Sequence, residues 1–124
     1  MRAQQQEQLA KLSNEFQTLQ RELSNLIESR QKLEAQSNEN EAVAKEFQKL
    51  SLNEKIYKLV GTALLLQEQN EAKQNVEKRL ELIRGDMKRT DQLIQAAESK
   101  METKKNEIVR IQTLTAAQAQ AGEV

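Results

Sequence analysis

The side chains that most often carry enzyme chemistry are largely missing from this chain of 124 residues. It has no His and no Cys, which excludes imidazole acid–base catalysis, thiol catalysis, disulfides and zinc sites built from Cys and His. Ser, Asp, Glu and Lys are present, but a catalytic constellation also needs a partnered base and a rigid pocket. We therefore predict that the chain is not an enzyme and holds no metal or cofactor.

The remaining candidates for chemistry have simpler structural explanations. The glycines, Gly61, Gly85 and Gly122, are isolated, whereas a phosphate-binding loop needs several glycines close together. Glu39 and Glu41 are better explained as a solvated helix face than as metal ligands. The chemistry of this chain must therefore lie in the surfaces that its elements present.

The charge balance argues against polyanionic partners. Lys+Arg and Asp+Glu both total 19, and residues 1–50 and 71–124 are each close to neutral. Nucleic acids and anionic membranes both select a basic surface, so we expect neither as a partner. No apolar run approaches the roughly 20 residues that a membrane helix needs. The first residues also lack the apolar core of a signal peptide, and we expect a cytoplasmic location.

Two long runs of apolar residues at heptad spacing dominate the chain. The first passes through Leu9, Leu12, Phe16, Leu19, Leu23, Leu26, Arg30 and Leu33. The second passes through Val76, Leu80, Ile83, Met87, Thr90, Ile94, Ala97, Met101, Lys104, Ile108, Ile111 and Thr115. Heptads in a sequence with 31% charged and 2% aromatic residues are typical of coiled coils. We predict a helix over residues 1–52, a second over 71–115 and a frayed tail over 116–124.

The heptad of the first helix weakens after Leu33. We interpret the apolar residues from Val43 onward as a register change within one helix, and a break at residues 37–40 is the alternative. The two heptads also fit an antiparallel pair. Leu9 would face Ile111 and Leu33 would face Met87, and the residue numbers of both pairs add up to 120. This places the fold axis at residue 60, next to the central glycine.

The central stretch, residues 56–66, has no helical period and predicts a β-hairpin over residues 54–67 with its turn at Gly61. Large apolar residues fall on both faces of this hairpin, although a strand with one exposed face should alternate. We predict that the hairpin joins a larger sheet made with other chains. The alternative is a short apolar connection between helices. The residues predicted to mediate this assembly are Ile56, Tyr57, Leu59, Val60, Leu64, Leu65 and Leu66.

The two ends of the predicted helix pair also carry apolar residues. They are Leu9, Leu12, Phe16, Ile108, Ile111 and Leu114. If the ends splay, these side chains offer apolar surface to a client protein. The alternative is that they are ordinary seam residues, which pattern alone favours.

Three segments resemble the prefoldin β-type subunits in the same order. They are residues 30–36 (RQKLEAQ), 57–61 (YKLVG) and 71–83 (EAKQNVEKRLELI). The resemblance covers roughly residues 8–112. It implies a mainly α fold, an antiparallel two-helix coiled coil with one central β-hairpin, whose hairpins assemble into a multi-chain β-barrel base. It implies a single prefoldin-like domain over residues 1–124.

The resemblance also implies a function. Prefoldin is a hetero-hexamer of α-type and β-type subunits that holds unfolded or nascent proteins, such as actin and tubulin, at the tips of its coiled coils. It passes them to the cytosolic chaperonin without ATP. The expected partners are therefore the other prefoldin subunits, unfolded clients and the chaperonin. The alternative is a structural coiled-coil scaffold or tether that binds folded partners.

Overall fold

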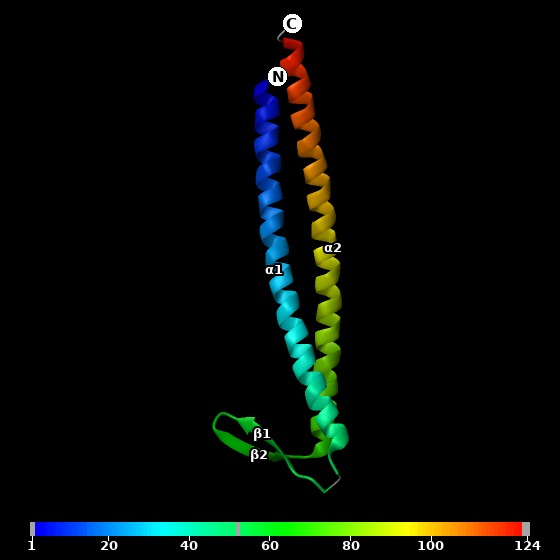
Figure 1. Ribbon diagram of the computed structural model, residues 1–124. Coiled ribbons are helices and arrows are strands. Elements are labelled where there is room, and N and C mark those ends of the chain that lie inside the picture. The colour runs from blue at the N-terminus through cyan, green and yellow to red at the C-terminus, as the bar shows by residue number, and fades with distance from the viewer. Residues whose placement is uncertain (1, 52, 123–124) are drawn as a thin grey trace. The chain divides into compact units, whose positions relative to one another are not determined.

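The computed structural model describes residues 2–51 and 53–122 of the chain. In order, its elements are α1 (Arg2–Lys49), β1 (Ile56–Val60), β2 (Ala63–Gln67) and α2 (Gln69–Gly122) (Figure 1). The prediction of a mainly helical fold with one antiparallel hairpin is confirmed.

The chain divides into two compact units. The terminal unit contains Met1–Ser29 with Thr90–Val124, and the hairpin unit contains Arg30–Arg89. Each unit contains a segment of α1 and a segment of α2, and both helices are continuous across the unit boundaries. The single domain predicted over residues 1–124 stays a prediction.

Burial follows the two predicted heptads. Along α1, Leu12 is buried and its heptad neighbours are half-buried. Along α2, the most deeply buried seam residues are small or aliphatic: Val76, Leu80, Ala97 and Ile111. Thr115, the last predicted seam position, is exposed. The contact between the helices is therefore a narrow apolar seam, as expected for a pair of helices without a wide core.

The register change predicted after Leu33 is wrong. α1 is continuous, and burial keeps the original step through Ser37, Asn40 and Ala44, while Val43 is 44% exposed. The seam tolerates Ser37 because its side chain is small, and it tolerates Asn40 because the side-chain amide has a hydrogen-bond acceptor within the same helix. The side-chain amide of Asn40 donates to the Gln36 carbonyl of the same helix at 2.7 Å.

Both helices differ from the predicted bounds where they meet the hairpin. α1 ends at Lys49 with a tight last turn, in which the Leu50 N–H donates to the Phe47 carbonyl at 3.3 Å. The predicted end at residue 52 falls on Leu52, which lies outside the described residues. α2 begins at Gln69 and not at residue 71. The Ala72 N–H donates to the Glu68 carbonyl at 3.0 Å, so the first helical turn already includes Asn70.

The frayed tail predicted over residues 116–124 is wrong as far as the structure describes it. α2 continues through Gly122, and residues 112–121 are all exposed. Ala and Gln have high helix propensity, and no Gly or Pro interrupts the segment before Gly122. Local propensity therefore extends the helix beyond the last buried seam residue, Ile111.

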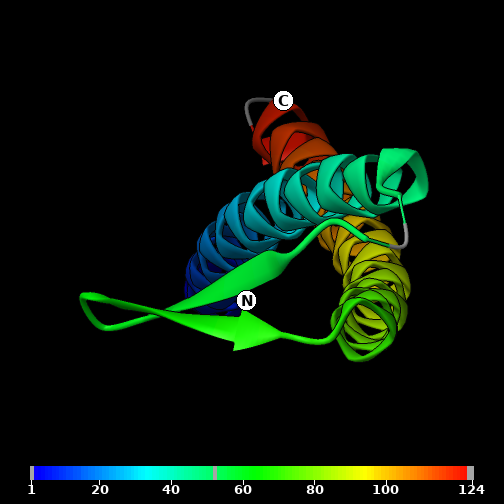
Figure 2. The ribbon, with the colours of Figure 1, turned by 90° about the horizontal axis from the view of Figure 1, so that it is seen from below.

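The hairpin has the turn that its sequence predicts. β1 and β2 pair antiparallel, from Ile56 opposite Gln67 to Val60 opposite Ala63. This register leaves Gly61 and Thr62 as a two-residue turn. Gly61 has a φ of 61°, which is the positive φ that a type II′ turn requires at its first central position. Figure 2 shows the two strands leaving the neighbouring helix ends as a twisted ribbon.

A glutamine holds together the two connections between hairpin and helices. The side-chain amide of Gln69, the first residue of α2, donates to the Ser51 carbonyl at 2.8 Å and also to the Glu54 carbonyl. The Glu54 N–H in turn donates to the Ser51 carbonyl at 3.1 Å. Gln69 thus joins the start of α2 to the segment that follows α1 and fixes the base of the hairpin.

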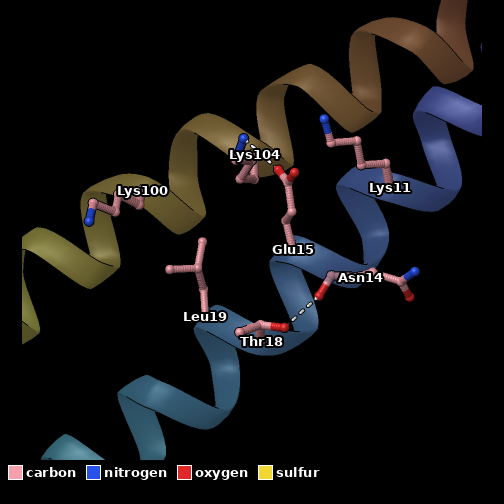
Figure 3. A pocket seen from close by; sticks show the side chains of 7 residues that line it. All are labelled: Lys11, Asn14, Glu15, Thr18, Leu19, Lys100 and Lys104. Atoms are coloured by element: carbon pink, nitrogen blue, oxygen red, sulfur yellow. Dashed lines mark hydrogen bonds and ion pairs between the residues drawn. The ribbon is translucent and has the colours of Figure 1, made fainter.

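An ion pair links the two helices of the terminal unit. Lys104 Nζ lies 2.7 Å from Glu15 Oε2, and the two side chains are 30% and 36% exposed (Figure 3). The hydrogen bond from Lys104 lowers the pKa of Glu15, with help from the nearby Lys11 charge, and the same bond raises the pKa of Lys104. Thr115 Oγ1 also donates to Gln5 Oε1 at 3.5 Å, so both contacts confirm the antiparallel pairing within this unit.

We predict opposite effects on stability for alanine at two glycines. Gly85→Ala should raise the free energy of unfolding by about 0.5–1 kcal/mol, because Gly weakens a helix interior. A Cβ there meets only the Arg89 guanidinium at 3.6 Å, an ordinary contact. Gly61→Ala should lower stability by about 1–2 kcal/mol, because its positive φ disfavours a side chain. Chemical denaturation measures both, and equal effects of the two changes would contradict the assigned turn.

We predict a pH-dependent effect of Glu15→Gln. Because the pKa of Glu15 is lowered in the fold, the pair stabilises above the ordinary carboxyl pKa of 4.5, and this contribution is lost as the pH falls through the lowered value. Because the pKa of Lys104 is raised, its contribution is present below the ordinary value of 10.5 and lost as the pH rises through the raised value. The variant should therefore have a lower thermal midpoint than wild type at about pH 7, and the same midpoint at about pH 2.

Glu22→Gln is the matched control, since Glu22 is an exposed carboxylate of the same helix with no ion pair among the described residues. Thermal unfolding followed by circular dichroism across the pH range measures the difference. A constant gap between Glu15→Gln and wild type at all pH values would show that the ion pair does not contribute.

Candidate functional site

The hairpin presents one wholly apolar face. The register places Tyr57 opposite Leu66 and Leu59 opposite Leu64, so that these four side chains share a face of the ribbon. Their exposed fractions are 56% for Tyr57, 64% for Leu66, 67% for Leu59 and 65% for Leu64. Each of these large side chains would contribute about 1–2 kcal/mol if covered. Such a cluster is unfavourable in water and marks an interaction surface.

The other face is mixed but still largely apolar. Val60 and Leu65 are 49% and 54% exposed, and Ile56 is half-buried. Lys58 lies opposite Leu65 on this face and supplies its one charge. The structure thus brings together all seven residues predicted for assembly. Their role in assembly stays a prediction.

The hairpin also leaves backbone groups to be paired. Within the described residues the sheet has two strands, so the outer edge of each strand lacks a neighbour. A two-stranded sheet is marginal in water, and an open edge pairs readily with another strand. Apolar faces and open edges therefore coincide in residues 56–67.

The residues predicted to bind clients lie in the terminal unit but differ in accessibility. Leu12 and Ile111 are buried, at 5% and 4% exposure, and pack in the helix seam. Leu9, Phe16 and Ile108 are half-buried, and Leu114 is 49% exposed. Leu114 is therefore the member of this set that a partner reaches directly, whereas Leu12 and Ile111 become accessible only if the helices separate. A client-binding role for the set stays a prediction.

Sequence reasoning missed a groove on one side of the terminal unit. Its volume is about 460 Å³. Its lining, shown in Figure 3, consists of Lys11, Asn14, Glu15, Thr18, Leu19, Lys100 and Lys104. We call it the lysine groove. The heptads place Leu19 and Lys104 in the seam, but Lys11 and Lys100 lie outside it, where a single charge gives no evident signal in the sequence.

A second groove in the same unit has a different lining. Its volume is about 420 Å³, and we call it the glutamate groove. It is lined by Phe16, Leu23, Glu98, Met101, Glu102 and Lys105. Phe16, predicted as a client-binding residue, lies here beside Met101. Both grooves therefore combine apolar seam residues with charged flanks.

Other kinds of site have little support in the described part of the chain. Residues 2–51 and 53–122 contain no group of three or more acidic, His or Cys side chains placed to hold a metal ion. None of the described helices is long and apolar enough to cross a membrane. The features that stand out are the exposed hairpin and the grooved helix pair.

Comparison with known proteins places these features in a family. A sequence profile described as "Prefoldin subunit" matches residues 5–113. Prefoldin subunit 6 of Saccharomyces cerevisiae is 38% identical over 108 residues, which cover 87% of this chain and 95% of the yeast protein. Prefoldin subunit 6 of Arabidopsis thaliana is 35% identical over 120 residues, with 94% and 93% coverage. The human protein of the same name is 36% identical over 97 residues, with 78% and 75% coverage.

The fold agrees with these relatives. The crystal structure of the prefoldin beta subunit from Thermococcus strain KS-1 superposes with a TM-score of 0.77, covering 82% of this chain and 89% of that chain. The identity in this superposition is 17%, so it supports the fold alone. The profile match and the extended similarity to several subunit 6 proteins together establish that the chain belongs to the prefoldin family.

Proposed function

We propose that this chain is one subunit of a hetero-hexameric, ATP-independent co-chaperone that binds unfolded or nascent proteins. Membership of the prefoldin family supports a chaperone subunit. The observation that carries the proposal is the uncovered hairpin, in which Tyr57, Leu59, Leu64 and Leu66 share one exposed apolar face. Other chains would bury this apolar face, and prefoldin subunits of the α type and the β type are the proposed partners.

The apolar surface of the terminal unit supports the proposed binding of clients. Leu114 is exposed, and Leu9, Phe16 and Ile108 are half-buried. The seam between the helices is narrow, so these apolar side chains keep part of their surface open to solvent. An unfolded chain offers many short apolar segments, each of which binds weakly. Several helix pairs in one assembly would hold such a chain by multivalency, because the later contacts form at high effective concentration.

The remaining steps of the proposal follow from the family resemblance. The bound proteins are of the actin and tubulin type, and they pass to the cytosolic chaperonin, which places the assembly in the cytoplasm. Release then depends on competition for the client and not on nucleotide hydrolysis. Release by competition suits a client that is held by many weak contacts, since each contact breaks easily when another protein covers the same segment of the client.

Leu59→Glu should prevent assembly. A charge on the shared apolar face cannot be buried against another subunit without a large desolvation cost, so we expect at least a tenfold loss of the hetero-oligomer. Leu82→Glu is the matched control, because Leu82 is 68% exposed on α2, close to the 67% of Leu59. Native mass spectrometry after co-expression with other prefoldin subunits measures assembly. A wild-type yield with Leu59→Glu, or a homo-oligomeric scaffold in its place, would refute the proposed role.

Leu9→Glu combined with Leu114→Glu should reduce client holding while sparing assembly. We expect the assembled variant to suppress aggregation of denatured actin less well than wild type, because two apolar contacts are removed from the helix pair of this subunit. Val109→Glu is the control, since Val109 is 50% exposed and Leu114 is 49% exposed. Light scattering measures aggregation. Full suppression by an intact variant assembly would show that clients bind elsewhere.

A further inference from the structure

The lysine groove, defined above by its seven lining residues, has a positively charged lining around an apolar floor. It contains three lysines and one glutamate around Leu19 (Figure 3). Leu19 is half-buried, and the aliphatic stems of the lysines extend the apolar surface on either side of it. The groove therefore combines an apolar floor with an excess of positive charge.

The polar groups of the groove divide into satisfied and available ones. Lys104 is occupied by the Glu15 carboxylate at 2.7 Å, and the Thr18 hydroxyl donates to the Asn14 carbonyl at 3.0 Å. Lys11 and Lys100 are exposed and make no ion pair within 4.0 Å in the part of the chain that the structure describes, although the Lys11 charge also acts on Glu15 at longer range. The two ammonium groups that remain available come from different helices, one on each bank of the groove.

The glutamate groove provides an internal contrast. Its volume is similar, about 420 Å³ against about 460 Å³, and its floor is also apolar. Its charged lining has the opposite balance, with Glu98 and Glu102 against Lys105. The same pair of helices thus presents two apolar grooves of comparable size and opposite charge, which gives it the means to distinguish segments by their charge.

We propose that the lysine groove binds apolar segments of unfolded proteins that are flanked by acidic residues. Apolar side chains of the segment lie on Leu19 and the lysine stems, and its carboxylates pair with Lys11 and Lys100. Charge complementarity identifies this occupant, because a segment flanked by basic residues meets two like charges at the same place. The proposal rests on the client-binding function proposed above and assigns to it a substrate class.

The test compares two labelled peptides with the same apolar core, one flanked by glutamates and one by lysines. Their affinities for the assembled complex containing the full chain are measured by fluorescence anisotropy. For wild type we expect tighter binding of the acidic peptide, with a preference that shrinks as salt is added. Lys11→Glu/Lys100→Glu should weaken the acidic peptide about tenfold and leave the basic peptide unchanged or tighter, and Lys11→Gln/Lys100→Gln should fall between.

The matched control is Lys78→Glu/Lys88→Glu, which makes the same change in net charge on exposed lysines of the hairpin unit. It should leave both affinities close to wild type. Equal wild-type affinities for the two peptides, or equal losses in the two double variants, would overturn the proposal. So would protection of Lys11 and Lys100 from amine labelling in the peptide-free complex, because a neighbouring subunit would then occupy the groove.

Failure of this proposal is distinguishable from failure of the client-binding function. If the complex suppresses aggregation of denatured actin but shows no charge preference that depends on Lys11 and Lys100, the lysine groove alone is wrongly assigned. If the complex neither suppresses aggregation nor binds either peptide, the holding function itself is wrong, and the groove proposal falls with it.

Discussion

The constraint on which the rest of this structure depends is that a two-stranded hairpin cannot cover its own faces. Tyr57, Leu59, Leu64 and Leu66 lie on one side of the ribbon and stay more than half exposed. The opposite face is not covered either, because Val60 and Leu65 on it are 49% and 54% exposed. The turn at Gly61 and the Gln69 hydrogen bonds hold the ribbon in shape, but they leave both of its faces exposed.

The helices differ from the hairpin, because they bury single residues at intervals along the seam as far as Ile111 and form no wide core. The deepest residues are small or aliphatic, such as Ala97 and Val76, and polar Ser37 lies among them. A pair of helices joined by so narrow a seam leaves grooves on both sides, lined by seam residues and by the charged residues beside them. The proposed roles in assembly and in client binding therefore fall on different parts of one sequence.

Much of this architecture could be predicted because it depends on local pattern. The heptads identified the buried seam from Leu9 to Ile111, and one glycine between β-forming residues identified the turn. The errors came where propensity and packing disagree. The weak heptad at Ser37 and Asn40 predicts a register change, yet the seam accepts both residues in the original register. The Ala/Gln tail stays helical beyond Ile111, the last buried residue of α2. The Gln69 contacts and the two grooves depend on three-dimensional neighbours and left no periodic signal.

Antiparallel pairing decides which charged residues line each of the two grooves. In each helix the residues beside the seam fall into two sets, one on each side, and antiparallel packing brings like sets together. Lys11 and Lys100 therefore line one groove, and Glu98 and Glu102 line the other. Because the sides share only the seam, charge on one can be set without disturbing the other. A neutral chain can in this way present two distinct charged surfaces, which its net charge of zero conceals.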